Sequence, residues 1–140
     1  MEHHDTNANK ARLASMQGDM NYLRIECRPQ RVVAALYDTL PFPKIGTLQE
    51  LAFDLGITAV EGDVELTGVV FRAYNEHQLL WEERWNRAIL KAHTGEASLH
   101  IAQGTGLALR SIHFLRHAHM PTHYLDVVAV ARKVSPSAES

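Results

Sequence analysis

The stretch Leu51-Ala52-Phe53-Asp54-Leu55-Gly56-Ile57-Thr58 decides the fold class of this chain. Its large apolar residues occupy every second position, which places all of them on one face of an extended strand. The preceding Thr47-Leu48-Gln49-Glu50 also matches a helix capping box, so a helix competes with the strand here. We favour the strand, because the alternation has no slip and Gly56 would cut a helix short.

A second long strand is predicted between Val64 and Tyr74, although its alternation changes phase near Gly68. Val64 and Leu66 share one face, whereas the apolar residues after Gly68 continue on the other phase. One extra residue at this point, as in a β-bulge, returns every apolar side chain to a common face. The residues brought together in this way are Val64, Leu66, Val69, Phe71 and Ala73.

The last strand predicted is Tyr124 to Arg132, which is almost continuously apolar from Val127 to Ala131. A strand of this kind is usually central in its sheet, with both faces covered. Shorter stretches with strand-like alternation or apolar runs complete the pattern. They are Leu23–Cys27, Val32–Leu36, Ala97–Ile101 and Leu107–Leu115.

The segment 79–92 allows two interpretations. Trp81, Trp85 and Ile89 recur at every fourth position, which is the stripe of an amphipathic helix. Alternatively, the start of the segment closes a strand that pairs with Val69–Tyr74. The sequence leaves the choice between helix and strand open.

Strands separated by Gly- or Pro-bearing turns predict an all-β protein, an antiparallel β-sandwich of immunoglobulin-like architecture, with at most one helix at 79–92. The Cys–Trp–Cys core signature of antibody domains is absent, so this analogy is architectural. A chain of 140 residues has the size of one domain. We expect a flexible N-terminal tail at 1–20, one sandwich domain at 21–134 and a loose C-terminus at 135–140.

Charge, hydropathy and cysteine count exclude several kinds of partner and of covalent link. The net charge of −2 and the scattered basic residues give no footprint for nucleic acid. No stretch approaches the roughly 20 apolar residues that span a bilayer, and Met1–Met20 lacks the apolar core of a secretory signal. Cys27 is the only cysteine, which excludes an internal disulfide. We therefore expect a cytoplasmic protein that binds neither nucleic acid nor membrane.

Histidines gather near the C-terminus. If Leu107–Leu115 and Tyr124–Arg132 pair as a hairpin, four imidazoles lie on or beside its connecting loop. Imidazole binds zinc, copper and nickel, and a His-x-His pair on an extended chain points both rings to one side. The alternative is a solvated polar hairpin, because no second thiolate and no HExxH motif is present. The four candidate metal ligands are His113, His117, His119 and His123.

Other chemical candidates have a structural alternative. Trp81 and Trp85 could anchor a partner, or they could pack in the core. Cys27 could be a nucleophile activated by a histidine, yet its apolar phase is typical of a small core residue. Glu82 and Glu83 could supply paired carboxylates, but acidic residues beside arginines usually form a solvated face.

Three functional hypotheses follow. The first is a non-catalytic β-sandwich module that binds another protein or associates with itself, because open sandwiches have exposed edge strands and no catalytic pattern is recognised. This module needs no cofactor. The second is a metal-binding module that uses the four histidines. The third is a small enzyme of unassigned chemistry whose residues come from loops.

Overall fold

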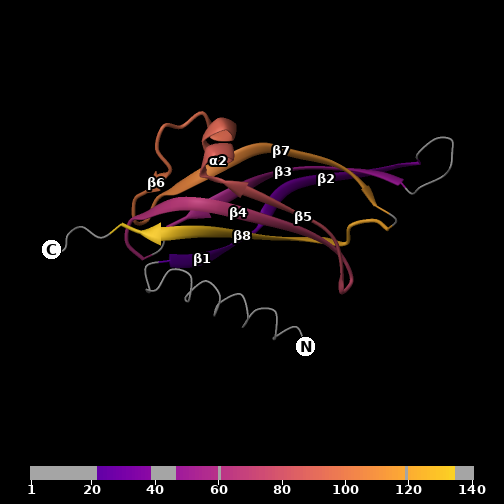
Figure 1. Cartoon of the computed structure of the whole chain (residues 1–140), viewed down its shortest axis with the longest axis horizontal. Coiled ribbons are helices and arrows are strands. Elements are labelled where there is room, and N and C mark those ends of the chain that lie inside the picture. The colour runs from indigo at the N-terminus through magenta and orange to yellow at the C-terminus, as the bar shows by residue number, and fades with distance from the viewer. Residues whose placement is uncertain (1–21, 39–46, 60, 119, 135–140) are drawn as a thin grey trace.

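The computed structural model describes residues 22–38, 47–59, 61–118 and 120–134. These residues form strands and one short helix (Figure 1). In chain order the elements are β1 (Tyr22–Cys27), β2 (Pro29–Asp38), β3 (Thr47–Thr58), β4 (Val64–Asn75), β5 (Gln78–Asn86), α2 (Arg87–Thr94), β6 (His100–Ile101), β7 (Gly106–Ala118) and β8 (Tyr124–Lys133). The predicted tails at 1–20 and 135–140 lie outside the described residues.

Two antiparallel sheets pack together. The larger has the strand order β1-β8-β4-β5, with β6 beside the start of β4, and the smaller has the order β2-β3-β7. The prediction of a mostly β protein with packed antiparallel sheets is therefore confirmed. No helix in the described part of the chain is both long and apolar enough to cross a membrane.

The alternating stretch Leu51–Thr58 lies in β3, the middle strand of the smaller sheet. Its alternating residues Leu51, Phe53, Leu55 and Ile57 are at most 3% exposed. The strand prediction is confirmed, and the competing capping box is wrong, since residues 47–50 open the strand. Long-range pairing with β2 and β7 supplies the backbone hydrogen bonds that a helix would have supplied locally.

The predicted bulge in β4 is also confirmed. The register with β8 shifts between Leu66 and Gly68, so Thr67 is the additional residue. The five residues predicted to share the core face are at most 1% exposed. A Cβ at Gly68 would lie 3.2 Å from the Trp85 carbonyl oxygen, which explains why a glycine stands next to the bulge.

The ambiguous segment 79–92 contains both a strand and a helix. β5 pairs with β4 along Gly68–Asn75, and α2 follows immediately. Asn86 separates the two elements, because its side chain accepts a hydrogen bond from the Ile89 amide at 2.9 Å and caps the helix. The helical stripe predicted from Trp81 onward is wrong for its first half. Residues four apart also share a face in a strand.

The predicted hairpin between Leu107–Leu115 and Tyr124–Arg132 is wrong. β7 pairs with β3 in the smaller sheet, whereas β8 lies between β1 and β4 in the larger one. The connection therefore crosses between sheets and is held by Gln49, which is 3% exposed. The Gln49 side chain donates to the Met120 carbonyl at 2.9 Å and accepts from the Thr122 hydroxyl. The central position predicted for β8 is confirmed.

Aromatic rings join the two sheets at the centre of the core. Phe53 and Phe114 come from the smaller sheet, and Phe71 and Trp85 come from the larger one. The Phe71 ring centroid lies 4.9 Å from that of Trp85 and 5.0 Å from that of Phe114, in edge-to-face contacts. Such pairs add to the hydrophobic gain of burial. The core therefore fixes β5 against β7.

Candidate functional site at the sheet edges

The sandwich has two lateral sides, each formed by one edge strand from each sheet. β5 and β7 lie on one side, which we call the closed side. β1 and β2 lie on the other, which we call the open side, and only Arg28 separates these two strands in the sequence. Edge strands carry unpaired backbone groups, so they are the places where a sandwich can bind another chain.

An ion pair bridges the closed side. Arg116 of β7 donates from Nη2 to Glu83 Oε1, and its guanidinium lies 5.0 Å from the centre of the Trp81 ring. Trp85 Nε1 donates to the other Glu83 oxygen at 3.2 Å. The side chains of Glu83 and Arg116 are 32% and 31% exposed. A charged side chain that turns inward from an edge strand discourages the addition of another strand.

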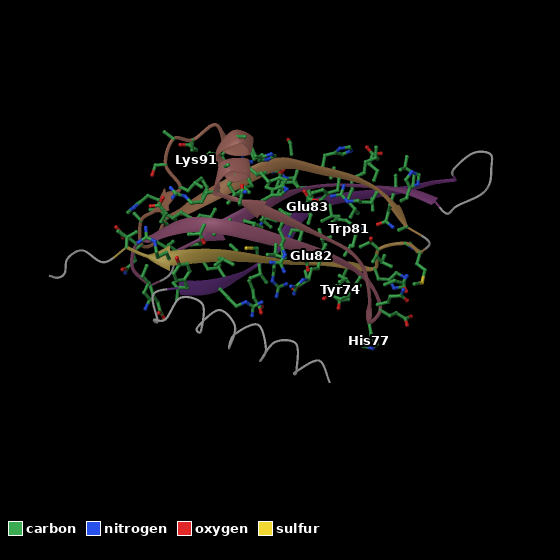
Figure 2. The ribbon with its side chains drawn as sticks, in the orientation of Figure 1. Tyr74, His77, Trp81, Glu82, Glu83 and Lys91 are labelled. Carbon is green, nitrogen blue, oxygen red and sulfur yellow. The ribbon has the colours of Figure 1, made fainter. Side chains whose placement is uncertain are left out.

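The helix α2 covers the same side. Its Leu90 side chain is fully buried, and the His93 ring lies 4.9 Å from the Trp85 ring. His93 Nε2 is 2.9 Å from the Arg110 carbonyl oxygen, so the helix is tied to β7 as well as to β5. Figure 2 shows Glu82 and Glu83 along β5, with Lys91 on the helix beyond them. The closed side is therefore doubly protected.

The two tryptophans face the core. Trp85 is 9% exposed, and Trp81 is partly buried between Phe114 and Arg116. This placement agrees with the core interpretation of both indoles. Trp81 Nε1 is buried and makes no hydrogen bond within the described part of the chain. A partner that used these indoles as anchors would first have to displace the Arg116 side chain.

The open side has no such protection along β2. Val32 and Val33 are 49% and 65% exposed, and no described strand pairs with the outer edge of β2. Ala34 is aligned with the buried Leu51 and is nevertheless exposed. The reason is that β1 ends at Cys27, whereas β2 continues past it (Figure 1). An apolar edge is thus accessible from both faces.

Asp54 of β3 shapes this edge. Its Oδ2 lies 3.5 Å from Arg31 Nη1 in β2, and its Oδ1 accepts from the Ser111 amide in β7 at 2.9 Å. Arg31 and Ser111 both have positive φ angles, of 55° and 58°, and each lies at a register shift beside β3. One aspartate therefore contacts the bulge on either side of it. Regular pairing of β2 with β3 resumes at Val33.

The described candidate metal ligands are divided between β7 and the segment just before β8. The hairpin on which that prediction was built does not form. His113 and His117 are on the exposed face of β7, where His113 Nε2 is 2.7 Å from Glu50 Oε2. His123 follows the crossover, with its Nε2 3.3 Å from Asn75 Nδ2. His119 lies outside the described residues. Within those residues no group of three or more potential ligands is arranged for a metal, and the metal site stays a prediction.

The candidate carboxylates and the cysteine have structural partners. On the outer face of the larger sheet, a hydrogen bond from Arg84 lowers the pKa of Glu82, and a hydrogen bond from Arg72 adds to this effect. Burial raises the pKa of the Cys27 thiol to about 11. A thiol with so high a pKa is a poor nucleophile near neutral pH. The core interpretation of Cys27 is confirmed by its 8% exposure.

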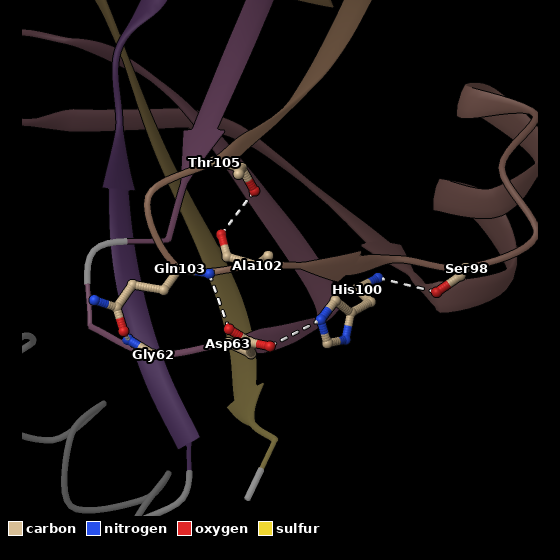
Figure 3. Close-up of polar contacts among 7 residues, drawn as sticks. All are labelled: Gly62, Asp63, Ser98, His100, Ala102, Gln103 and Thr105. Atoms are coloured by element: carbon tan, nitrogen blue, oxygen red, sulfur yellow. Dashed lines mark hydrogen bonds and ion pairs between the residues drawn. The ribbon is translucent and has the colours of Figure 1, made fainter. Parts of the chain in front are cut away.

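The sequence did not predict one polar cluster and one pair of stacked aromatic rings. Figure 3 shows Asp63, whose Oδ1 accepts from the Gln103 amide at 2.9 Å and whose Oδ2 lies 3.3 Å from His100 Nε2. These contacts tie the loop after β3 to the turn before β7. On the outer face of the larger sheet, Tyr74 and the half-exposed Tyr124 stack at 5.0 Å. Both clusters join segments far apart in sequence, so no local pattern predicts them.

Comparison with known proteins gives no match, since no protein-family model fits this chain and no curated protein or solved structure is significantly similar to it. The geometry of the edges is therefore the basis for a functional assignment.

Proposed function

We propose that this chain is a non-catalytic β-sandwich module, of immunoglobulin-like architecture, that binds a protein segment by strand addition at β2. The observation that carries the proposal is the exposed apolar edge at Val32 and Val33. In strand addition the main chain of the partner supplies affinity, and its alternating side chains supply specificity. The edge of β2 offers backbone groups for pairing and apolar side chains for contact.

The other edges are less suited to an added strand. β1 carries the charged residues Arg24 and Glu26 among its few positions. β5 turns Glu83 inward and is followed by the covering helix α2. β2 has no charged residue between Arg31 and Asp38. Because charge and coverage protect an edge against pairing, the partner is expected at β2.

Titration with a synthetic strand-forming peptide tests the proposal. The probe is a short peptide of alternating Thr and Val with lysines at its ends, and the readout is the backbone amide chemical shifts of the isotope-labelled protein. We expect shifts that saturate and that concentrate on the residues of β2. Val33→Lys should abolish them, because it places a charge at an apolar position that is 65% exposed beside the pairing edge.

Leu115→Lys is the matched control. Leu115 is 49% exposed on β7, so the substitution adds the same charge to the closed side. It should leave the peptide-induced shifts at β2 unchanged. Shifts confined to β5 or β7, or equal losses in the two variants, would overturn the proposal.

A further inference from the structure

We infer that Arg31 and Asp54 are a positioning pair, which sets the register of β2 on β3 and thereby selects the side chains that β2 presents to a partner. The consequence for binding rests on the proposed function, whereas the register itself does not. Arg31 Nη1 donates to Asp54 Oδ2 at 3.5 Å. Arg31 directly precedes Val32 and Val33, the two valines of the proposed binding edge.

The bulge at Arg31 determines which face of the sheet Val33 lies on. Between the pairs Gln30–Asp54 and Val33–Ala52, β2 has two residues where β3 has one. The additional residue reverses the alternation, since successive side chains of a strand point to opposite faces. Without it, Val33 would be aligned with the buried Leu51 and would face the interior.

The backbone at this bulge has a conformation that needs support. Arg31 has a φ of 55°, in the left-handed region that residues with a Cβ rarely adopt. A bulge whose first residue is left-handed usually has glycine there. Other residues persist in this conformation where the surrounding contacts hold them, and such residues gather at functional sites. Arg31 therefore requires a contact that offsets its strain.

The bulge in β7 has the support of the core, and the bulge in β2 does not. Ser111 has a φ of 58° and donates its amide to Asp54 Oδ1 at 2.9 Å. Leu109 and Ile112, on either side of it, are fully buried, so burial also holds this bulge. The Arg31 side chain is 79% exposed. Within the described residues, the Asp54 carboxylate is the side chain that holds it.

Replacing the arginine should therefore let β2 slip by one residue. In the register without the bulge, position 31 is aligned with the buried Phe53 and faces the interior. An arginine is disfavoured there, and an apolar side chain is accepted. Arg31→Val makes this change and also disfavours the bulge, because a β-branched residue tolerates a positive φ poorly. Val33 should then leave the outer face of the sheet.

Nuclear Overhauser effects between β2 and β3 measure the register. In the wild type, Val33 should contact Ala52 across the strands, and in Arg31→Val the contact should pass to Val32. Arg31→Gly is the matched control, since glycine adopts the left-handed conformation without support and should keep the wild-type contacts. A wild-type register in Arg31→Val, or a slipped one in Arg31→Gly, would overturn the inference.

A second pair of variants tests Asp54 itself. Asp54→Asn keeps an acceptor for the Ser111 amide and removes the charge beside Arg31. It should therefore show the slipped register next to the wild-type one. Adding Arg31→Gly to Asp54→Asn should restore the wild-type register alone. If Arg31→Val aggregates, this pair decides, and an unchanged register in Asp54→Asn overturns the role of the carboxylate.

Titration with the strand-forming peptide measures the consequence for binding. Arg31→Val should weaken binding by about three- to fivefold, the effect of one apolar cross-strand pair. Arg31→Gly should bind as the wild type does. A slipped strand that binds with wild-type affinity would overturn the link between register and binding. A peptide that does not bind the wild type would remove the proposed function, while the register contacts would still test the positioning pair.

Discussion

The two lateral sides of this sandwich differ in how their edge strands are protected. On the closed side, Glu83 and Arg116 form an ion pair between the sheets, and α2 packs over both edge strands. On the open side, Val32 and Val33 lie exposed in β2, which continues beyond the end of β1. A sandwich must protect all of its edges, so we propose association at this apolar edge, which no described residue covers.

The closed side also shows how an edge can be protected at little expense to the core. Arg116 lies over the Trp81 and Phe114 rings, so its long side chain covers apolar surface while its charge meets Glu83 at the rim. Nothing comparable covers the described residues of β2. The difference between the sides lies in these side chains, in the helix α2 over the closed side and in the end of β1 at Cys27 on the open side.

Removing the aromatic support of the closed side should have the largest effect. Phe114 is 4% exposed and contacts Phe53, Phe71, Trp81 and Trp85. Phe114→Ala should lower the free energy of unfolding by about 3–5 kcal/mol, measured by urea denaturation. The neighbouring Leu115→Ala, at a half-exposed position, should cost less than about 1 kcal/mol. Equal losses in the two variants would mean that Phe114 does not hold the sheets together.

Converting the closed side into an open one is the next prediction. Glu83→Val leaves Arg116 without its carboxylate and Trp85 Nε1 without its acceptor. We expect a loss of about 1–3 kcal/mol in stability, together with new higher oligomers seen by light scattering. Glu83→Gln keeps the size and an acceptor oxygen, so it should stay closer to the wild type. An unchanged oligomeric state in Glu83→Val would show that the inward charge does not protect β5.

Weakening the cover over the closed side should have a smaller effect. Asn86 caps α2 through its hydrogen bond from the Ile89 amide. Asn86→Ala should lower stability by about 1 kcal/mol, and amide hydrogen exchange should increase in the helix before it increases in β5. Asn86→Ser, which retains a capping oxygen, is the control. Equal exchange in both variants would remove the capping role.

The smallest effect is expected at Cys27, beside the open edge. Burial raises the pKa of its thiol from 9.0 to about 11, so the folded state holds the proton more tightly than the unfolded state does. This contribution to stability is complete below pH 9 and is lost as the pH rises toward 11. Urea denaturation across this range should show the loss, and Cys27→Ala should lack that part of the pH dependence. Rapid labelling of the folded protein by iodoacetamide at pH 8 would contradict the buried thiol.

Local patterns in the sequence predicted the strands and not their partners. The alternation in β3 and the bulge in β4 were predictable, because a period of two and its slip can be seen within one segment. The pairing of β7 with β3 was not, since nearby strands pair so often that a β7–β8 hairpin was the natural prediction. The buried Gln49 that holds the crossover lies 73 residues from Thr122.

The sequence predicted that the sandwich has exposed edge strands, but it did not predict which edge is the candidate binding site. Exposed edges follow from any open sandwich, but the choice of β2 depends on where β1 ends and on which side Glu83 meets Arg116. Those two residues are 33 positions apart and come from different sheets. The histidine cluster is dense in the sequence, but His113 and His117 lie on β7 in the smaller sheet, whereas His123 lies beside the larger sheet.

Hydrogen–deuterium exchange with and without the strand-forming peptide tests the difference between the sides most directly. If β2 is the binding edge, the amides between Val32 and Leu36 should exchange more slowly when the peptide is bound, while those of β5 and β7 stay unchanged. Slower exchange confined to β5 or β7, or bound peptide that leaves exchange in β2 as fast as before, would contradict the assignment of β2 as the binding edge.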